Sequence, residues 1–386
     1  MEKIKNILIV AGEASSDLHA SHLVQAIKEI NPSTQFSGLG GKRLKEQGVN
    51  LYFDLVELAV VGFWEVLKHL KKFKQIFADL LVKVDLNPPD LAILVDYPGF
   101  NLRLAKELKK RKIPIVYYIS PQVWAWGRGR LNLIRKFVDR MIVLFEFEKE
   151  LYKKEGIPVS FVGHPLLDLV KPTLNKEELL PKLNIPVTKY SVALLPGSRE
   201  KEVKNILPIM LDTARLMHND IPDIKFLILR ASTVRQDLFR QILSRYKLPV
   251  YILNDLTYDG LAASDFAIVA SGTATLETAL LGIPMVIIYK VSFSTWLYLR
   301  MAIKVPYIGM VNIIANRYIV PEFVQYNAKP RKIYSYIKDT LTDPGKLDRI
   351  KPLLHDVKLR LGQTQATKKA ARIIVELLEN YAHKSR

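Results

Sequence analysis

Short strand-like runs that alternate with segments of helical spacing constrain the fold of this chain more than any other feature. In the first half the runs lie at residues 7–11, 35–40, 91–95, 115–119, 141–144 and 159–162. In the second half they lie at residues 191–195, 226–229, 250–253, 266–270 and 285–289. Short apolar runs are typical of strands that are buried on both faces, and strand–helix alternation produces parallel sheets. The pattern predicts an α/β protein with two doubly wound, Rossmann-like sheets.

The length of 386 residues exceeds that of one ordinary hydrophobic core and favours two domains. Gly163-His164-Pro165 follows the last strand of the first half, and the segment up to about Pro186 lacks a strand signal, so we expect an interdomain linker near residues 164–175. His164 either faces a ligand site or caps this hinge. Apolar positions at helical spacing predict a final helix near residues 365–381 that crosses back to the first domain. The predicted domains are residues 1–165, 166–362 and 363–386.

The formal net charge of +19 requires an explanation, because the basic residues of the first half are clustered. The clusters are Lys68, Lys71, Lys72 and Lys74; Lys106, Lys109, Lys110, Arg111 and Lys112; and Arg128, Arg130, Arg135, Lys136 and Arg140. Such a field attracts nucleic acid, anionic lipid or phosphorylated substrates, and a solvated basic face without a partner is the alternative. The absence of cysteine excludes disulfides and thiolate sites.

No apolar run approaches the roughly 18 residues of a membrane span, and the run at residues 6–11 is too short for a signal peptide, so we expect a cytosolic protein. Apolar residues recur at helical spacing from Phe63 to Phe77, with the first lysine cluster on the other side. This pattern predicts an amphipathic helix with a buried face; a membrane-contacting helix is the alternative.

Candidate site residues of the first half follow predicted strands. The loop Gly12 to Asp17 opens a helix from about Leu18, with Ser16 or Asp17 as its cap, although it is not a G-x-G-x-x-G motif. Asp96 follows the strand at 91–95, and ligands of open parallel sheets bind beyond the carboxyl ends of the strands. Capping is the alternative role for Asp96, but we expect Asn101 to cap the helix that begins at Leu102.

Two tryptophans and an arginine follow the strand at 115–119. They are Trp124, Trp126 and Arg128, on a loop that contains Pro121 and Gly127. A loop of this kind at a strand end can hold a sugar or an acyl group beside a phosphate. The same side chains can also seal the edge of a core.

Two turns of the second half join a strand to a helix and can bind anions. The first contains Gly197, Ser198, Arg199 and Glu202; the second contains Ser271, Gly272, Thr273, Ala274 and Glu277. Free N–H groups at a helix start favour an anion, and an arginine adds donors suited to phosphate. The alternative is an ordinary strand–turn–helix connection without a ligand, which is common. The carboxylate of Glu277 can accept both hydroxyls of a ribose, or it is simply a glutamate favoured near a helix start.

Together these features describe a sugar-nucleotide glycosyltransferase of the GT-B architecture, in which two Rossmann-like domains face a central cleft. The sequence lacks an Asp-x-Asp pair, so we expect helix N-termini and Arg199 to neutralise the leaving pyrophosphate without a metal ion. One carboxylate suffices as the base of an inverting displacement, because a nucleoside diphosphate leaves without prior protonation. Neither a metal nor another cofactor is predicted.

The motifs together resemble the lipid-A-disaccharide synthase family. They are Ala11-Gly12-Glu13-x-Ser15, Ser120-Pro121-x-Val123-Trp124-Ala125-Trp126, Val162-Gly163-His164-Pro165-Leu166, Leu195-Pro196-Gly197-Ser198-Arg199-x-x-Glu202 and Ser271-Gly272-Thr273-Ala274-x-Leu276-Glu277. The resemblance extends beyond Gln325 and covers nearly the whole chain. Two positions depart from the family pattern, since Ser16 stands where glycine is usual and Gly99 where many members have an acidic residue.

The resemblance implies transfer of 2,3-diacylglucosamine from its UDP form to 2,3-diacylglucosamine 1-phosphate, which yields a β-1,6-linked disaccharide and UDP. It implies a peripheral enzyme on the cytoplasmic face of the inner membrane, where the basic first domain meets anionic lipid. Asp96 matches the family's essential aspartate and Arg199 and Glu277 match donor-nucleotide residues. Asn312 and Gln325 match polar positions beside the donor, while Glu13, Ser15, Trp124, Trp126 and Arg128 are candidate acceptor contacts.

Two other functions compete with this interpretation. A UDP-N-acetylglucosamine 2-epimerase has the same architecture, but it gives no reason for the loop of Trp124 and Trp126 or for the basic amphipathic helix. An RNA-binding protein would explain the charge, but the sequence lacks an aromatic motif of the RNP type. We therefore expect no nucleic-acid partner.

Overall fold

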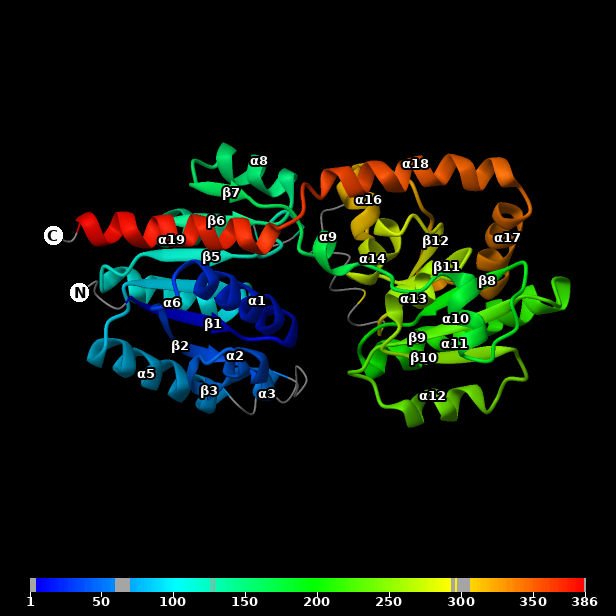
Figure 1. The fold of residues 1–386 in the computed structure, drawn as a ribbon, viewed down its shortest axis with the longest axis horizontal. Coiled ribbons are helices and arrows are strands. Elements are labelled where there is room, and N and C mark those ends of the chain that lie inside the picture. The colour runs from blue at the N-terminus through cyan, green and yellow to red at the C-terminus, as the bar shows by residue number, and fades with distance from the viewer. Residues whose placement is uncertain are drawn as a thin grey trace. The chain divides into compact units, whose positions relative to one another are not determined.

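The chain forms two compact units in the computed structural model, and each is described by itself (Figure 1). The structure describes residues 5–59, 70–125, 127, 129–292, 296 and 306–384. The first unit comprises Met1–Pro165 and Gly362–Arg386, and the second comprises Leu166–Leu361. The final helix therefore belongs to the first unit although the second unit lies between them in the sequence.

The first unit contains a seven-stranded parallel sheet in the order β3-β2-β1-β4-β5-β6-β7. The strands are β1 Asn6–Ala11, β2 Gln35–Gly40, β3 Asn50–Asp54, β4 Leu91–Val95, β5 Ile115–Tyr118, β6 Arg140–Val143 and β7 Val159–Phe161. The predicted Rossmann-like sheet is confirmed, but the expectation of about six strands missed β3. This edge strand is half-exposed and contains polar residues, so it shows no continuous apolar run.

Helices cover both faces of this sheet. They are α1 Ala14–Ile30, α2 Lys42–Glu46, α3 Leu55–Ala59, α5 Leu70–Leu86, α6 Pro98–Lys110, α7 Arg130–Phe137, α8 Glu146–Lys154 and α19 Ala366–Lys384. Ile7 and Ile9 of β1 face a core built with α1 and α19, which lie side by side, whereas Leu8 and Val10 face a core built with α5 and α6 (Figure 1). This alternation follows from the two-residue period of a strand.

The start of α1 differs from the prediction. The helix begins at Ala14, and the Ser16 hydroxyl bonds both the N–H and the carbonyl of Glu13, at 2.9 and 2.8 Å. Asp17 does not cap α1; its buried carboxylate accepts hydrogen bonds from the N–H groups of Gly41, at 2.7 Å, and Arg43, at 3.1 Å. Asp17 thereby caps α2 and ties the first two strand–helix connections together.

The second unit contains a six-stranded parallel sheet in the order β10-β9-β8-β11-β12-β13. The strands are β8 Ser191–Leu195, β9 Lys225–Arg230, β10 Val250–Asn254, β11 Phe266–Ala270, β12 Met285–Tyr289 and β13 Glu322–Val324. The predicted second Rossmann-like sheet is confirmed. The short strand β13 was missed, again because a partly exposed edge strand carries little apolar signal.

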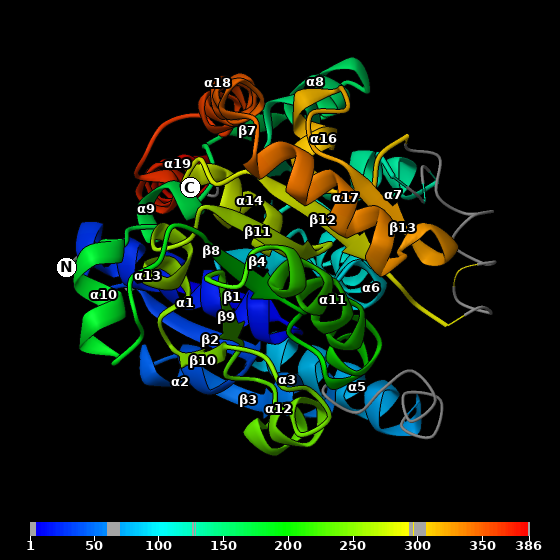
Figure 2. The same ribbon diagram turned by 90° about the vertical axis from the view of Figure 1, so that its right-hand side faces the viewer.

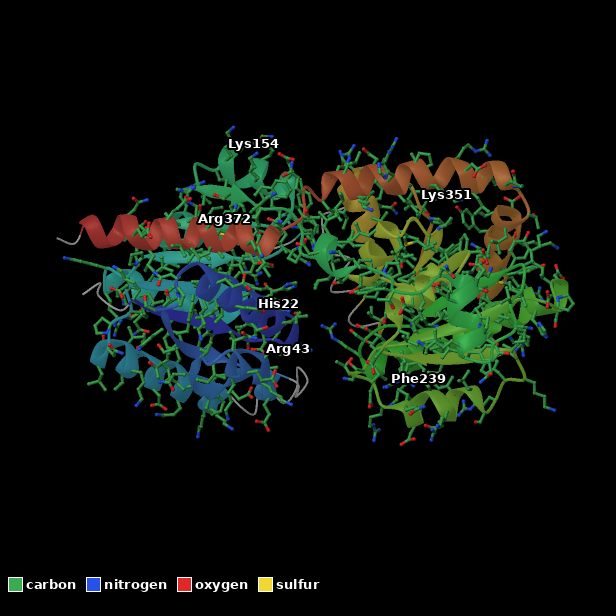
Figure 3. The ribbon with its side chains drawn as sticks, in the orientation of Figure 1. His22, Arg43, Lys154, Phe239, Lys351 and Arg372 are labelled. Atoms are coloured by element: carbon green, nitrogen blue, oxygen red, sulfur yellow. The ribbon has the colours of Figure 1, made fainter. Side chains whose placement is uncertain are left out.

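The helices of the second unit are α9 Leu166–Leu169, α10 Lys176–Lys182, α11 Glu200–Asp220, α12 Gln236–Leu243, α13 Thr257–Ala262, α14 Ala274–Leu280, α16 Met310–Ala315, α17 Pro330–Leu341 and α18 Pro344–Arg360, with a 3₁₀ turn at Gln325–Asn327. Helices α11 and α17 lie side by side over one face of the sheet (Figure 2). Phe239 of α12 is fully buried in the same core (Figure 3).

Part of the segment expected as a linker is built into the second unit. Its N–H groups at Thr173 and Leu174 donate to the carboxylate of Asp259 in α13, at 2.5 and 2.9 Å. These hydrogen bonds fix the segment, so the change from one unit to the other falls at Pro165 and Leu166.

Candidate functional site

A cavity of about 860 Å³ lies in the second unit at the carboxyl ends of its parallel strands. Residues that follow β8, β9, β10 and β11 line it, as expected for an open α/β sheet. The predicted donor residues that line it are Gly197, Ser198, Arg199, Glu202, Ser271, Gly272, Thr273, Ala274 and Glu277. The fold thus brings the two predicted anion-binding turns to one cavity.

The first turn depends on Gly197. Its φ of 114° lies in a region that favours glycine, and a Cβ atom there would approach the Glu202 Oε2 atom to 2.5 Å. The turn brings Ser198 and Arg199 to the start of α11, where the positive end of the helix dipole and the first N–H groups of the helix lie.

The N–H groups of this turn are not free, contrary to the prediction. The Glu202 Oε2 atom accepts hydrogen bonds from the N–H groups of Ser198, at 3.1 Å, and Arg199, at 3.3 Å. Its Oε1 atom pairs with Arg199 Nη1 at 3.2 Å. Glu202 therefore occupies the donors that were expected to hold an anion, as a glutamate at the third helical position commonly does in a capping box.

The second turn leaves donors available. The N–H groups of Gly272 and Thr273, just before α14, form no hydrogen bond among the described residues. The Ser271 hydroxyl donates to the carbonyl of Ile308 at 3.2 Å, which fixes the turn at the end of β11. An anion that enters the cavity therefore meets unpaired N–H groups at this turn.

Glu277 lies one turn into α14, and the Tyr258 hydroxyl donates to its Oε1 atom at 3.2 Å. Burial raises the pKa of Glu277, while the hydrogen bond from Tyr258 acts in the opposite direction. Burial and the neighbouring Glu277 raise the pKa of Tyr258. Tyr258 was missed by the sequence analysis, although it follows β10 and the strand-end rule that identified the other turns applies to it.

Asn312 and Gln325 are absent from the described lining of the cavity. The Asn312 side chain is fully buried; its Nδ2 donates to the Val320 carbonyl at 2.8 Å, and its Oδ1 accepts from the N–H groups of Ile319 and Val320 at 2.9 and 3.1 Å. The Gln325 amide bonds both the N–H and the carbonyl of Val291, each at 3.1 Å. Both side chains hydrogen-bond to the backbone in this structure, so neither is presented to the cavity as a contact for the nucleotide-sugar donor.

In the first unit, Asp96 and Glu13 follow neighbouring strands, because Ala11 of β1 is paired with Val95 of β4. Asp96 and Tyr97 have φ angles of 46° and 47°, in the left-handed region that is unfavourable for non-glycine residues. The Asp96 carbonyl accepts hydrogen bonds from the Tyr117 hydroxyl at 2.5 Å and from Asn101 Nδ2 at 2.8 Å. Backbone strain of this kind is concentrated at functional sites.

Asn101 does not cap the following helix as expected. That helix, α6, begins at Pro98 with Tyr97 as its N-cap residue, so Asn101 lies inside its first turn. Gly12 permits this arrangement, since a Cβ atom there would lie 2.3 Å from the Tyr97 ring.

Burial and the neighbouring Glu13 raise the pKa of Asp96 to about 6, while the Tyr97 N–H and Arg130 act in the opposite direction. A carboxylate with this pKa is a stronger base than an ordinary aspartate and remains largely ionised at neutral pH. The electrostatics therefore suit a general base at this position.

The other candidates of the first unit have different surroundings. Glu13 and Ser15 are exposed at the start of α1. Trp124 is partly buried, and its Nε1 atom donates to the Glu148 carboxylate at 3.2 Å. Trp126 and Arg128 lie outside the described residues. His164 is buried; burial and the neighbouring His19 lower its pKa to about 3, so it is neutral.

The charged surface agrees in part with the expected amphipathic helix. In α5, Lys71, Lys72 and Lys74 are exposed, while Ile76 and Phe77 pack into the core. Lys68 and the residues from Phe63 to Leu67 lie outside the described part. Lys154 and Arg372 add cations on the surface of the same unit (Figure 3). None of the described helices has the length and apolar character needed to cross a membrane.

Sequence comparison gives a consistent result over nearly the whole chain. The family profile described as lipid-A-disaccharide synthetase matches residues 7–376. The lipid-A-disaccharide synthase of Syntrophus aciditrophicus is 44% identical over 376 residues, which cover 97% of this chain and 98% of the relative. That of Geobacter sulfurreducens is 42% identical over 372 residues, which cover 96% and 97%.

Comparison with solved structures supports the fold. A putative UDP-N-acetylglucosamine 2-epimerase from Listeria monocytogenes has a TM-score of 0.65 at 11% identity, covering 98% of this chain and 97% of the other. The glycosyltransferase of kitacinnamycin has a TM-score of 0.61 at 13% identity, covering 96% and 98%. At these identities the likeness concerns the α/β fold alone.

Proposed function

The chain belongs to the lipid-A-disaccharide synthetase family, and we propose that it condenses UDP-2,3-diacylglucosamine with 2,3-diacylglucosamine 1-phosphate. The products are the β-1,6-linked lipid A disaccharide 1-phosphate and UDP. The observation that carries this proposal is the identity of 44% over almost the full length of a named synthase. As a member of the family, the chain is a glycosyltransferase of lipid A biosynthesis with a nucleotide-sugar donor.

The second unit, residues 166–361, is the proposed donor unit. Its cavity combines an exposed arginine, Arg199, with the unpaired N–H groups of Gly272 and Thr273, which suit a diphosphate. The Glu277 carboxylate, held by Tyr258, suits the two hydroxyls of the ribose. These donors supply positive potential to the leaving UDP without requiring a divalent ion, so metal independence is part of the proposal.

The first unit is the proposed acceptor unit, with Asp96 as the base. The Asp96 carboxylate accepts the proton of the acceptor 6-hydroxyl while that oxygen attacks C1 of the donor sugar. The bond between C1 and the UDP oxygen breaks, the configuration at C1 inverts, and UDP leaves with the bonding electrons. The pKa of about 6 keeps Asp96 ready to accept this proton at neutral pH.

We propose a peripheral location on the cytoplasmic face of the inner membrane. Both proposed substrates carry acyl chains and negative charge, and the exposed lysines of α5 suit an anionic lipid surface. Glu13, Ser15 and Trp124, together with Trp126 and Arg128, remain proposed acceptor contacts.

An assay with both acylated substrates tests the proposal. Purified protein incubated with UDP-diacylglucosamine and diacylglucosamine 1-phosphate should release UDP and form disaccharide in equal amounts. UDP-N-acetylglucosamine alone serves as the control for the epimerase of similar fold. Epimerisation of that compound without disaccharide formation would reject the proposal.

A further inference from the structure

Buried polar side chains of α8 contact the loop that follows β5. The proposed chemistry does not use them. Glu148 lies in the first turn of α8 and is 3% exposed. It is the hydrogen-bond acceptor of the Trp124 indole, with 3.2 Å between Nε1 and Oε1. A carboxyl group is rarely buried to this extent unless it is paired or hydrogen-bonded.

Further contacts connect the same helix to the same loop. The Ser120 hydroxyl lies 2.8 Å from the Tyr152 hydroxyl, and both residues are buried. The Trp124 ring packs edge-on against Phe147, with 5.3 Å between the ring centroids. Residues 147, 148 and 152 of α8 thus hold both ends of the loop from Ser120 to Trp124, which continues toward Trp126 and Arg128.

We propose that Glu148 is a positioning residue that fixes the loop of Trp124 for binding of the acylated acceptor. This inference rests on the proposed function, because it assigns the loop to the acceptor. Glu148 does not touch the reacting atoms; it acts through Trp124 and Ser120. Loss of its hydrogen bond should weaken acceptor binding and leave the donor cavity of the second unit unchanged.

The protonation state of Glu148 determines which substitution replaces it most closely. Burial raises the pKa of Glu148 to about 8, while hydrogen bonds from Trp124, Ser120 and the backbone act in the opposite direction. Tyr152 is the titratable group that faces Glu148. Burial raises the pKa of Tyr152 above its ordinary value, so its hydroxyl also stays protonated at neutral pH. The neutral carboxyl therefore predominates at pH 7, and glutamine reproduces its shape, its acceptor and its donor.

The test compares Glu148→Gln and Glu148→Leu in the full chain, with Glu146→Gln as the control. Glu146 lies two residues earlier in α8, is exposed and pairs with Lys149 at 3.3 Å. We expect Glu148→Leu to raise the acceptor KM about tenfold, the usual scale for a lost buried hydrogen bond, with the UDP Kd unchanged. Glu148→Gln and Glu146→Gln should retain the wild-type KM at pH 7.

A further measurement separates positioning from general stability. In a double-mutant cycle with Trp124→Phe, the loss in kcat/KM for the acceptor should be clearly less than additive, since both changes break one contact. Additive losses or an unchanged KM in Glu148→Leu would each overturn the proposal.

Hydrogen exchange of the loop distinguishes this inference from the proposed function. Peptides that cover residues 119–125 should exchange faster in Glu148→Leu than in the wild type, with no change in Glu148→Gln. If the wild type forms no disaccharide, the proposed function fails and the exchange result still decides whether Glu148 holds the loop. If Glu148→Leu does not fold, Trp124→Phe decides, because this change removes the same hydrogen bond from the other side. An unchanged acceptor KM and unchanged loop exchange in Trp124→Phe would overturn the proposal.

Discussion

The Glu202 Oε2 atom accepts a hydrogen bond from the Ser198 N–H at 3.1 Å, inside the cavity proposed for the donor. The same atom accepts from the N–H of Arg199, and the other carboxylate oxygen pairs with the guanidinium of Arg199. An internal carboxylate thus occupies an anion site at a helix start. A diphosphate that uses this turn must displace it.

Glu202→Gln should therefore tighten UDP binding. The change removes the negative charge that competes with the diphosphate and retains a side chain suited to the capping box. We expect the Kd for UDP to fall by about threefold to tenfold, the scale of one partly screened charge interaction. Isothermal titration of Glu200→Gln is the matched control, because Glu200 pairs with Arg235 and does not line the cavity. Weaker binding by Glu202→Gln would mean that Glu202 instead orients Arg199 for the ligand.

Arg199→Ala should weaken binding of UDP and of the donor. A charge-assisted pair with phosphate that is partly exposed contributes about 1.5–3 kcal/mol, so the Kd should rise at least tenfold. Arg199→Lys should recover part of this loss, because lysine keeps the charge but not the fork of donors. An unchanged donor Kd and rate in Arg199→Ala would remove this residue from the donor site.

Asp96→Asn should abolish turnover and leave the UDP Kd within about twofold of the wild type. Removal of a general base reduces rates by about 10²–10⁴, whereas the donor cavity belongs to the other unit. Single-turnover rates and UDP titration together check this prediction. Loss of UDP affinity with normal turnover at saturation would show that the role is misassigned.

The wild-type rate should depend on pH through the same residue. Burial and Glu13 raise the pKa of Asp96 to about 6, and the base must be ionised to accept a proton. The rate should therefore be full above this pKa and fall tenfold per pH unit below it. Glu13→Gln should move the midpoint to lower pH, because it removes the neighbouring negative charge. A midpoint near 4 in the wild type would contradict the assignment.

Replacement of Lys71, Lys72 and Lys74 with glutamine should reduce sedimentation with anionic vesicles. Each lysine near an anionic surface contributes about 1 kcal/mol, so the partition coefficient should fall more than tenfold at low salt. Replacement of Lys346, Lys351 and Lys358 of α18 gives a control with the same change in net charge. Equal partitioning of the α5 variant and the wild type would show that this face is only solvated.

Asn312→Ala should destabilise the second unit by about 2–4 kcal/mol. The change leaves the N–H groups of Ile319 and Val320 and the Val320 carbonyl without their buried partners. Urea unfolding checks the prediction, and the UDP Kd of the folded protein should remain near the wild-type value. A normal stability with a large loss of donor affinity would return Asn312 to the role of a ligand contact.

Much of the fold was predictable because it depends on local pattern. Buried strands such as β4 and β11 have to be continuous apolar runs, since helices cover both faces of a parallel sheet. The positions of Asp96 and Gly197 followed from the same pattern, because each lies just beyond a strand end, and Glu277 lies one turn into the helix that follows β11. Edge strands β3 and β13 were missed because half-exposed strands do not need that signature.

Sequence alone determined the α/β class, the strand ends that carry the candidate site residues and, through its motifs, the family. Tertiary structure decided which partners the polar groups of those strand ends have. It showed that the Asp17 side chain caps α2 instead of α1. It also showed that Asn312 hydrogen-bonds to the backbone and that Glu202 accepts from the N–H groups of Ser198 and Arg199. Periodicity identifies which residues are buried, but a hydrogen bond joins two specific atoms. The donor that a carboxylate meets depends on packing between segments that can be far apart in the chain.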